Sequence, residues 1–433
     1  MWRITIALVC LALVMGGGAS AMPDYGLDES ELIDGAPPPW SEPLMPAFVQ
    51  ASEDFHVPLD LLLALAYFGS NFENRAFAPT IEKGFGLMAL RINGLSSESL
   101  AEAKSLTGAT ENELKLDPVA SIRGAAAVLD DYAKAKKINR DKGLDAWLDC
   151  VIKYAGLDDE CSRIFAGEVY GLFQRGLDYT NRAGERFIIE PQETSVDVEA
   201  LYGTANQVAS TDYGPAVWNA AASCNYSAYT TSKDTYIVHT VEGSYAGCIS
   251  WFKNCAASCS AHYVTAYDGR ITQMVREAYV AWHVSCYNSW SIGNEHEGYA
   301  ASSSHPTAQY NASALLAREI CNERGMPKAH RAVRPGILGH IDVTRCCCGT
   351  HTDPGNGWDW NYYIGQVVGA PPAPTWAATY RAQSFPSSMV AGSTAIVWAE
   401  FNNTGTGTWT HSHTYLGTSS PQDRSSPFCN TPN

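Results

Sequence analysis

With 433 residues, of which 45% are hydrophobic and 17% charged, the chain is long enough for about two to four domains of about 100–200 residues, each with a buried core. The formal net charge at pH 7 is −16, from 45 acidic and 29 basic residues. Nucleic-acid binding requires a clustered excess of Lys and Arg, so this composition argues against a nucleic-acid partner. It leaves the oligomeric state open.

The beginning of the chain, residues 1–21, has the layout of a secretory signal peptide. An apolar run over residues 4–15 follows a basic start, and small residues lead to a cleavage site after Ala21. No later run reaches the length of a transmembrane helix. We therefore expect a secreted or cell-wall-associated protein without a membrane span. Once Cys10 leaves with the signal, 12 of the 13 cysteines remain, and in an exported chain they predict disulfides.

A helical domain is predicted over residues 44–180, after an acidic and proline-rich linker over residues 22–43. Pro58 stands before a run of leucines and alanines that is apolar nearly all round, as in a central buried helix. Asp117 precedes a second helix as its cap. The periodicity stays helical to the end of this region, so we expect an all-α domain.

Residues 181–211 are charged and mixed, which predicts a second linker, and residues 212–368 form the next domain. Strand and helix patterns alternate within it, which favours an α/β domain around a central mixed sheet. The clearest elements are a buried strand at 236–238, a hairpin of strands at 262–266 and 271–275, and a helix at 306–324.

The C-terminal region begins with a proline-rich linker over residues 369–378. Residues 379–433 show alternation and turn residues typical of β structure, and they look like the immunoglobulin-like modules of exported bacterial proteins. A complete sandwich of this kind needs about 100 residues, so we expect a partial one. The sequence therefore predicts a multidomain protein.

Histidines and acidic residues gather in three segments of the α/β domain. These are AWHVSCYNSWSIGNEHEG (281–298), GILGHIDVTR (336–345) and GTHTDPG (349–355). His239 stands at the end of the predicted strand 236–238, where a rigid support can direct a side chain into a cleft. A lone histidine is more often an ordinary core or surface residue, so its interpretation depends on the three segments.

Together these segments resemble the zinc-dependent N-acetylmuramoyl-L-alanine amidases of type 2, a superfamily shared with peptidoglycan-recognition proteins. The resemblance covers about residues 212–366. It implies a zinc ion held by His239, His340 and Asp353, and a peptidoglycan substrate cut at the amide between N-acetylmuramic acid and L-alanine. Three N or O ligands with a fourth position open suit a catalytic zinc. The alternative is a recognition protein that binds muropeptide without cutting it.

The resemblance also implies two catalytic residues. Glu295 occupies the place of the glutamate that orients or deprotonates the attacking water, and Glu297 is the alternative because both would share one face of a regular strand. His351 matches the position of a cationic donor that stabilises the oxyanion. His262 and His283 also match the family, and for them a supporting role near the cleft and simple core packing both stay open.

The loop between His340 and Asp353 contains Cys346 to Cys348 and is a few residues longer than usual in the family. Its thiols could bind a metal or form disulfides, and we expect disulfides to other parts of the domain. A disulfide between Cys150 and Cys161 is also expected in the helical domain. The candidate partners of the triplet are Cys224, Cys248, Cys255, Cys259, Cys286 and Cys321. With the triplet they make an odd number, so one cysteine either stays free or pairs with Cys429.

The helical domain contains VPLDLLLALAYFGSNF and then GFGLMAL, which resemble lytic transglycosylases and other lysozyme-like domains. In those enzymes the buried helix ends in a catalytic glutamate followed by serine, whereas here Gly69 precedes Ser70. Glycine cannot donate the proton that glycosidic cleavage requires, so we expect no glycosidase activity. Glu73, about one turn further on, is the weaker alternative acid. Glycan binding and simple support both stay open for this domain.

Overall fold

The structure, a computed structural model, describes residues 38–369 except Ala76, Asn93 and residues 204–207, together with residues 378–384, 388 and 398–403. The expected signal peptide, most of the first linker and most of the C-terminal segment lie outside the described residues. The described residues up to Val367 belong to one compact unit, and those from Val368 onward belong to a second.

The first part of the compact unit is helical, as predicted. Its helices are α2 (Met45–Phe55), α3 (Leu59–Ser70), α4 (Ser99–Thr107), α5 (Glu111–Leu116), α6 (Pro118–Lys136), η1 (Arg140–Trp147), α7 (Leu148–Ala155) and α8 (Asp159–Arg175). All residues of α3 from Leu61 to Ser70 are buried, so it is the central helix that its composition predicts. Asp117 caps α6 by accepting a hydrogen bond from Val119 N at 2.8 Å.

Two expectations for this part are wrong. It is not all-α, because it also contains two short antiparallel pairs, β1 (Gly84–Phe85) with β2 (Leu90–Arg91) and β3 (Leu177–Thr180) with β4 (Arg186–Ile189). Residues 181–211 are also more than a linker. They contain β4, α9 (Val198–Leu201) and β5 (Val208–Ala209), and Phe187 and Ile189 of β4 are buried in the core, so this segment is folded onto the unit.

A seven-stranded mixed sheet forms the second part. Its order is β13-β8-β12-β9-β10-β6-β5, and the strands not yet defined are β6 (Val217–Trp218), β8 (Thr235–Thr240), β9 (Tyr263–Thr265), β10 (Ile271–Gln273), β12 (Ser291–His296) and β13 (Gly336–Gly339). β13, β8, β12 and β9 are parallel neighbours, whereas β9 and β10 form the predicted antiparallel hairpin. The predicted α/β architecture with a mixed sheet is therefore confirmed.

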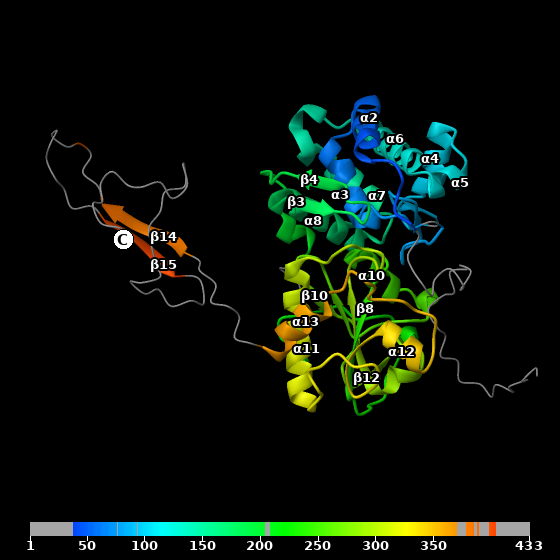
Figure 1. Ribbon diagram of the computed structural model, residues 1–433. Coiled ribbons are helices and arrows are strands. Elements are labelled where there is room, and N and C mark those ends of the chain that lie inside the picture. Colours follow the sequence, from blue (N-terminus) through cyan, green and yellow to red (C-terminus); the bar gives the residue numbers. More distant parts are fainter. Residues whose placement is uncertain are drawn as a thin grey trace, which may run out of the picture. The chain divides into compact units, whose positions relative to one another are not determined.

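Helices cover both faces of this sheet (Figure 1). They are α10 (Tyr245–Phe252), α11 (Thr307–Arg324), α12 (His340–Cys346) and α13 (Trp360–Val368). Tyr236 and Val238 of β8 pack with α11 and α13, whereas Ile237 packs with Val343 of α12. Since side chains alternate along a strand, His239 shares the α12 face with Ile237.

The helical part packs against the sheet where β8 and β12 end. Glu82 from the loop before β1 accepts hydrogen bonds from Ser244 N at 3.3 Å and Ser244 Oγ at 2.8 Å, at the N-terminus of α10. A Cβ atom on Gly247 would lie 2.5 Å from Cδ of Glu82, so only glycine leaves room for this carboxylate. A negative charge is favourable at a helix N-terminus, and this contact joins the two parts.

The second unit contains β14 (Ala378–Ser384) and β15 (Trp398–Asn403), which form an antiparallel pair. This agrees with β structure, while the expected immunoglobulin-like arrangement depends on residues outside the described ones. Among the described helices, none is long and apolar enough to cross a membrane.

Candidate active site

Three neighbouring parallel strands bring the predicted site residues to one edge of the sheet. His239 is the fifth residue of β8, and the register pairs it with Glu295 of β12, so both side chains lie on the α12 face. On the other side of β8, Gly339 of β13 pairs with Val238, and His340 follows immediately as the first residue of α12. Parallel strands end at the same edge, which places the three residues together.

His239, His340 and Asp353 form a buried cluster. His239 Nδ1 lies 3.1 Å from His340 Nδ1 and 3.1 Å from Asp353 Oδ2, and His340 Nδ1 lies 3.2 Å from Asp353 Oδ1. All three side chains are at most 9% exposed. Their ligand atoms all lie within 4.8 Å of one another, so these three described residues could together hold a metal ion.

The backbone fixes the direction of Asp353. Gly355 N donates to Thr352 O at 3.2 Å and closes the predicted turn, while Ile341 N donates to Asp353 O at 2.9 Å. Burial opposes ionisation of the carboxyl group, but His340 and then His239 outweigh it and hold the pKa of Asp353 well below its usual value. The cluster therefore presents an ionised carboxylate.

A chain of hydrogen bonds fixes the tautomer of His239. Ser291 Oγ donates to Tyr287 O at 2.8 Å, so it accepts from His283 Nε2, which lies 3.1 Å away. Burial, and then the neighbouring His239, keep the pKa of His283 well below its usual value, so its ring is neutral and Nδ1 accepts. His239 Nε2 donates to that atom at 2.8 Å. The lone pair of His239 therefore lies on Nδ1, which faces the cluster.

His262 supports the sheet at a greater distance from the cluster. Gly293 N of β12 donates to His262 Nδ1 at 3.0 Å, and His262 Nε2 donates to Tyr279 O at 3.2 Å. Of the two histidines with open roles, His283 thus contacts the cluster directly and His262 does not.

The structure distinguishes Glu295 from Glu297. Glu295 is fully buried beside His239, and neither of its carboxyl oxygens has a hydrogen-bond partner among the described residues. Burial, then the charge of Asp353, then that of Glu242, raise its pKa well above the usual value. Glu297 accepts hydrogen bonds from Tyr245 N at 3.2 Å and Tyr267 N at 2.7 Å, so its carboxyl oxygens are occupied by backbone N–H groups.

His351 stacks on His340 with ring centroids 4.1 Å apart, and its Nδ1 lies 3.8 Å from Asp353 Oδ1. Its side chain is 32% exposed, which leaves an opening to solvent. Burial and His340 lower its pKa to about 4. The ring is therefore neutral at pH 7, in contrast to the cationic donor that the resemblance implies.

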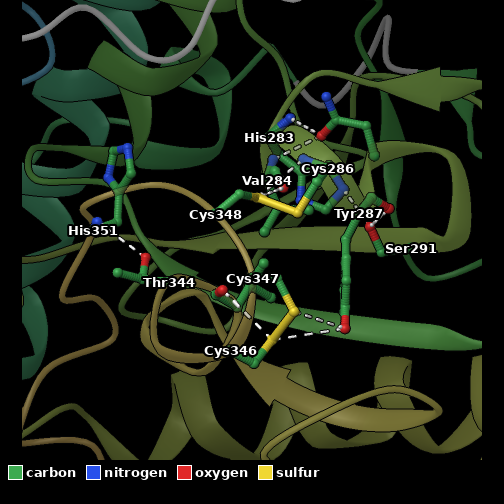
Figure 2. The surroundings of a disulfide bond; sticks show 12 residues. His283, Val284, Cys286, Tyr287, Ser291, Thr344, Cys346, Cys347, Cys348 and His351 are labelled. Carbon is green, nitrogen blue, oxygen red and sulfur yellow. Dashed lines mark hydrogen bonds between the residues drawn. A yellow bond between two sulfur atoms is a disulfide. The ribbon is translucent and has the colours of Figure 1, made fainter. Parts of the chain in front are cut away.

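The cysteine triplet is bound in disulfides. Cys348 pairs with Cys286 of η5 (Ser285–Trp290), which confirms a link to another part of the domain, whereas Cys346 and Cys347 pair with each other (Figure 2). Figure 2 also shows Thr344 Oγ1, which accepts from His351 N at 3.1 Å. Disulfide sulfurs are not thiolates, so this triplet offers no metal ligand.

The remaining described cysteines divide into one pair and five free thiols. Cys224 pairs with Cys255. The expected disulfide between Cys150 and Cys161 is wrong, because both are free in the apolar core of α7 and α8. The other free thiols, all buried, are Cys248, Cys259 and Cys321, while Cys429 lies outside the described residues.

A side chain at position 69 would be crowded by the segment between β1 and β2. A Cβ atom on Gly69 would lie 3.1 Å from Leu87 O and 3.2 Å from Ala89 Cβ. Glu73 is buried and bound to Arg182, whose N donates at 2.8 Å and whose Nε donates at 3.0 Å. Neither position therefore offers a free carboxyl group in a cleft.

Glu242 is a further acidic residue near the site, beyond those that the sequence segments indicate. It lies three residues after His239, and its charge contributes to the raised pKa of Glu295. An acidic residue directly beyond the strand that carries His239 was the available signal.

Comparisons with known sequences point to one family. A sequence model described as N-acetylmuramoyl-L-alanine amidase matches residues 230–356. N-acetylmuramoyl-L-alanine amidase A from Achromobacter lyticus is 41% identical over 174 residues, which cover 36% of this chain and 96% of that protein.

Solved structures show lower similarity. The hydrolase AmiA of Staphylococcus aureus is 18% identical, with a TM-score of 0.30, over 40% of this chain and 90% of that one. The amidase LysC of Clostridium intestinale is 15% identical, with a TM-score of 0.28, over 35% and 95%. The match covers nearly the whole length of the Achromobacter protein. The chain therefore belongs to the N-acetylmuramoyl-L-alanine amidase family of peptidoglycan amidases.

Proposed function

We propose that the protein is a zinc-dependent amidase that hydrolyses the amide between N-acetylmuramic acid and the L-alanine of the stem peptide. The observation that carries the proposal is the cluster of His239, His340 and Asp353. Two imidazoles and a carboxylate are a donor set that zinc prefers at catalytic sites.

The spacing of the donor atoms supports the same metal. Ligand atoms at about 2.0–2.1 Å from a tetrahedral zinc lie about 3.3 Å from one another. The separations in the cluster are 3.1, 3.1 and 3.2 Å. His239 presents its lone pair at Nδ1 because His283 accepts the proton of Nε2. A ligand histidine that donates its other ring N–H to a neighbour is the usual arrangement.

Bound zinc supplies Lewis-acid chemistry, which polarises an amide carbonyl and makes water acidic enough to attack at neutral pH. Glu295 is the proposed general base. It lies beside His239, and its oxygens are not engaged by other described groups. The positive charge of a bound zinc would favour the ionised form of this carboxyl group, which would accept a proton from water and return it to the leaving nitrogen. His351, neutral and partly exposed, is the proposed N–H donor to the carbonyl oxygen.

We further propose that the protein acts outside the cytoplasm, on peptidoglycan of a cell wall. The signal-peptide pattern of residues 1–21 supports export. The disulfides Cys224–Cys255 and Cys286–Cys348 fit an oxidising compartment.

The test is mass spectrometry of purified peptidoglycan digested by the full chain, with and without a zinc chelator. Release of peptides with a free N-terminal alanine, lost with chelator and restored by zinc, is the expected result. Asp353→Asn should abolish both zinc binding and release. Products that persist in metal-free protein would refute zinc dependence, while tight wall binding without products would support a recognition protein.

A further inference from the structure

Arg75 of the helical part reaches the chain segments that leave the candidate site. It lies between α3 and β1, and its side chain is only 4% exposed. Nη1 donates to Glu242 Oε2 at 2.8 Å, and Nη2 donates to Pro79 O at 3.1 Å. Cζ lies 4.1 Å from the centroid of the Tyr299 ring. A buried guanidinium requires such partners, and here they fix its position on three sides.

Two of these partners follow the two strands of the site. Glu242 comes three residues after His239, beyond β8, and Tyr299 comes four residues after Glu295, beyond β12. Ala300 N donates to Glu242 Oε1 at 2.6 Å. The carboxylate of Glu242 thus ties the two strand ends together, and the guanidinium holds that carboxylate.

The backbone of Glu242 also depends on the helical part. Its φ is 57°, in the left-handed region that few residues other than glycine adopt. Ile81 N donates to Glu242 O at 2.8 Å. Such a conformation persists where its surroundings hold it, and the helical part supplies partners for both the carbonyl and the carboxylate of this residue.

The segment after Tyr299 supports the loop that carries Asp353. A Cβ atom on Gly355 would lie 2.0 Å from Ala300 O, and one on Gly357 would lie 2.1 Å from Ser302 O. Glycine permits this close approach of two backbones. A displacement of residues 300–302 would therefore push on the loop that carries Asp353.

We propose that Arg75 is a positioning residue of the amidase site, which acts through Glu242 and the chain beyond β12 to set the relative positions of His239, Glu295 and Asp353. The helical part then supports the amidase site by holding Glu242 in place. This inference rests on the proposed roles of those three residues in zinc binding and catalysis.

The experiment compares Arg75→Met, Arg75→Lys, Glu242→Gln and the double variant Arg75→Met/Glu242→Gln in the full chain. Arg140→Met is the matched control, because Arg140 makes the same kinds of contact within the helical part. It donates to the carboxylate of Asp130 and to backbone carbonyls, and its Cζ lies 5.2 Å from the centroid of the Trp147 ring. Zinc affinity is measured by competition with a chromophoric chelator. Thermal unfolding of zinc-free protein, kcat and KM are measured alongside.

Arg75→Met should lower zinc affinity and kcat by about 10–100-fold, as expected when a group that orients ligands is removed, with KM little changed. Arg75→Lys should recover part of the loss because an ammonium group can still pair with Glu242. The double variant should lose no more than Arg75→Met, since the two residues act as a unit. Arg140→Met should lower the unfolding temperature while zinc affinity and kcat stay at wild-type values.

Wild-type zinc affinity and kcat in Arg75→Met would overturn the inference, as would additive effects of Arg75→Met and Glu242→Gln or an equal loss in Arg140→Met. Asp353→Asn, measured in parallel, separates the two proposals. If Asp353→Asn keeps wild-type zinc affinity, the metal site itself is wrong. If it loses zinc while the Arg75 variants do not, only the positioning role fails. Should Arg75→Met not fold, Arg75→Lys and Glu242→Gln give the same comparison.

Discussion

His239 Nε2 lies 2.8 Å from His283 Nδ1, and this contact leaves the lone pair of His239 on the atom that faces His340 and Asp353. The ring of His283 fits there because residue 293 of β12 is glycine. A Cβ atom at this position would lie 2.3 Å from His283 Nδ1. A buried imidazole behind the cluster therefore sets the chemistry of its neighbour.

Replacement of His283 by alanine should lower zinc affinity by about 10–100-fold, because His239 loses the acceptor that fixes its tautomer and ring orientation. Competition with a chromophoric chelator measures this affinity. His305→Ala is the control, since His305 is also buried but contacts Gln309 and Trp358 instead of the cluster. Equal zinc affinity in wild type and His283→Ala would contradict the proposed support.

Replacement of Glu295 by glutamine should lower kcat by about 10²–10⁴-fold, the usual loss when a general base is removed, without a change in zinc affinity. The amide has nearly the shape of the carboxyl group but cannot accept the proton. Glu297→Gln is the control, because Glu297 binds the backbone of Tyr245 and Tyr267. If Glu297→Gln lost kcat and Glu295→Gln kept it, the two roles would have to be exchanged.

Removal of the disulfide Cys286–Cys348 by a double serine substitution should lower the free energy of unfolding by about 2–4 kcal/mol, because the bond closes a long loop of the unfolded chain. The two residues are 62 positions apart. Urea unfolding gives the difference. Cys346→Ser/Cys347→Ser removes a bond between neighbouring residues, which closes no comparable loop, so its effect should be much smaller. Equal losses in both variants would contradict the loop-closure explanation.

Stability should fall as pH rises, because two buried carboxyl groups meet between the helical and α/β parts. Burial, and then Glu297, raise the pKa of Glu168 well above its usual value, and burial raises the pKa of Glu297 to about 7. These groups bind protons more tightly in the folded chain than in the unfolded one. The free energy of unfolding therefore decreases from the unfolded pKa upward through the folded pKa of Glu297.

Urea unfolding between about pH 5 and about pH 8 measures this slope. Glu168→Gln should make the dependence of the free energy of unfolding on pH less steep. The amide does not titrate, it can donate a hydrogen bond to Glu297, and the substitution removes the like charge beside Glu297. Glu160→Gln, an exposed change in the same helix, should keep the wild-type slope. An unchanged slope in Glu168→Gln would show that this pair does not control the pH dependence.

Much of the α/β part follows from local pattern. The buried strand at β8, the hairpin of β9 and β10, and the helix α11 that ends before Gly325 are confirmed, because alternation, turn residues and caps act over a few residues. The disulfide partners were not predictable from spacing alone. Cys286 meets Cys348 (Figure 2) only because η5 and the loop after α12 pack on the same side of β8 and β13, where Tyr287 and Cys348 belong to one apolar cluster.

The sequence by itself determined the family and the residues that could form its site, since the segments around His239, Glu295, His340 and Asp353 carry the resemblance. Only the tertiary structure decided that Glu295, not Glu297, lies beside His239, because both glutamates fall on one face and the register between β12 and β8 decides which of them pairs with His239. It alone also decided that residues 181–211 are folded and that Arg75 meets Glu242, 167 positions away. Contacts between distant segments depend on packing of whole elements, which no short pattern specifies.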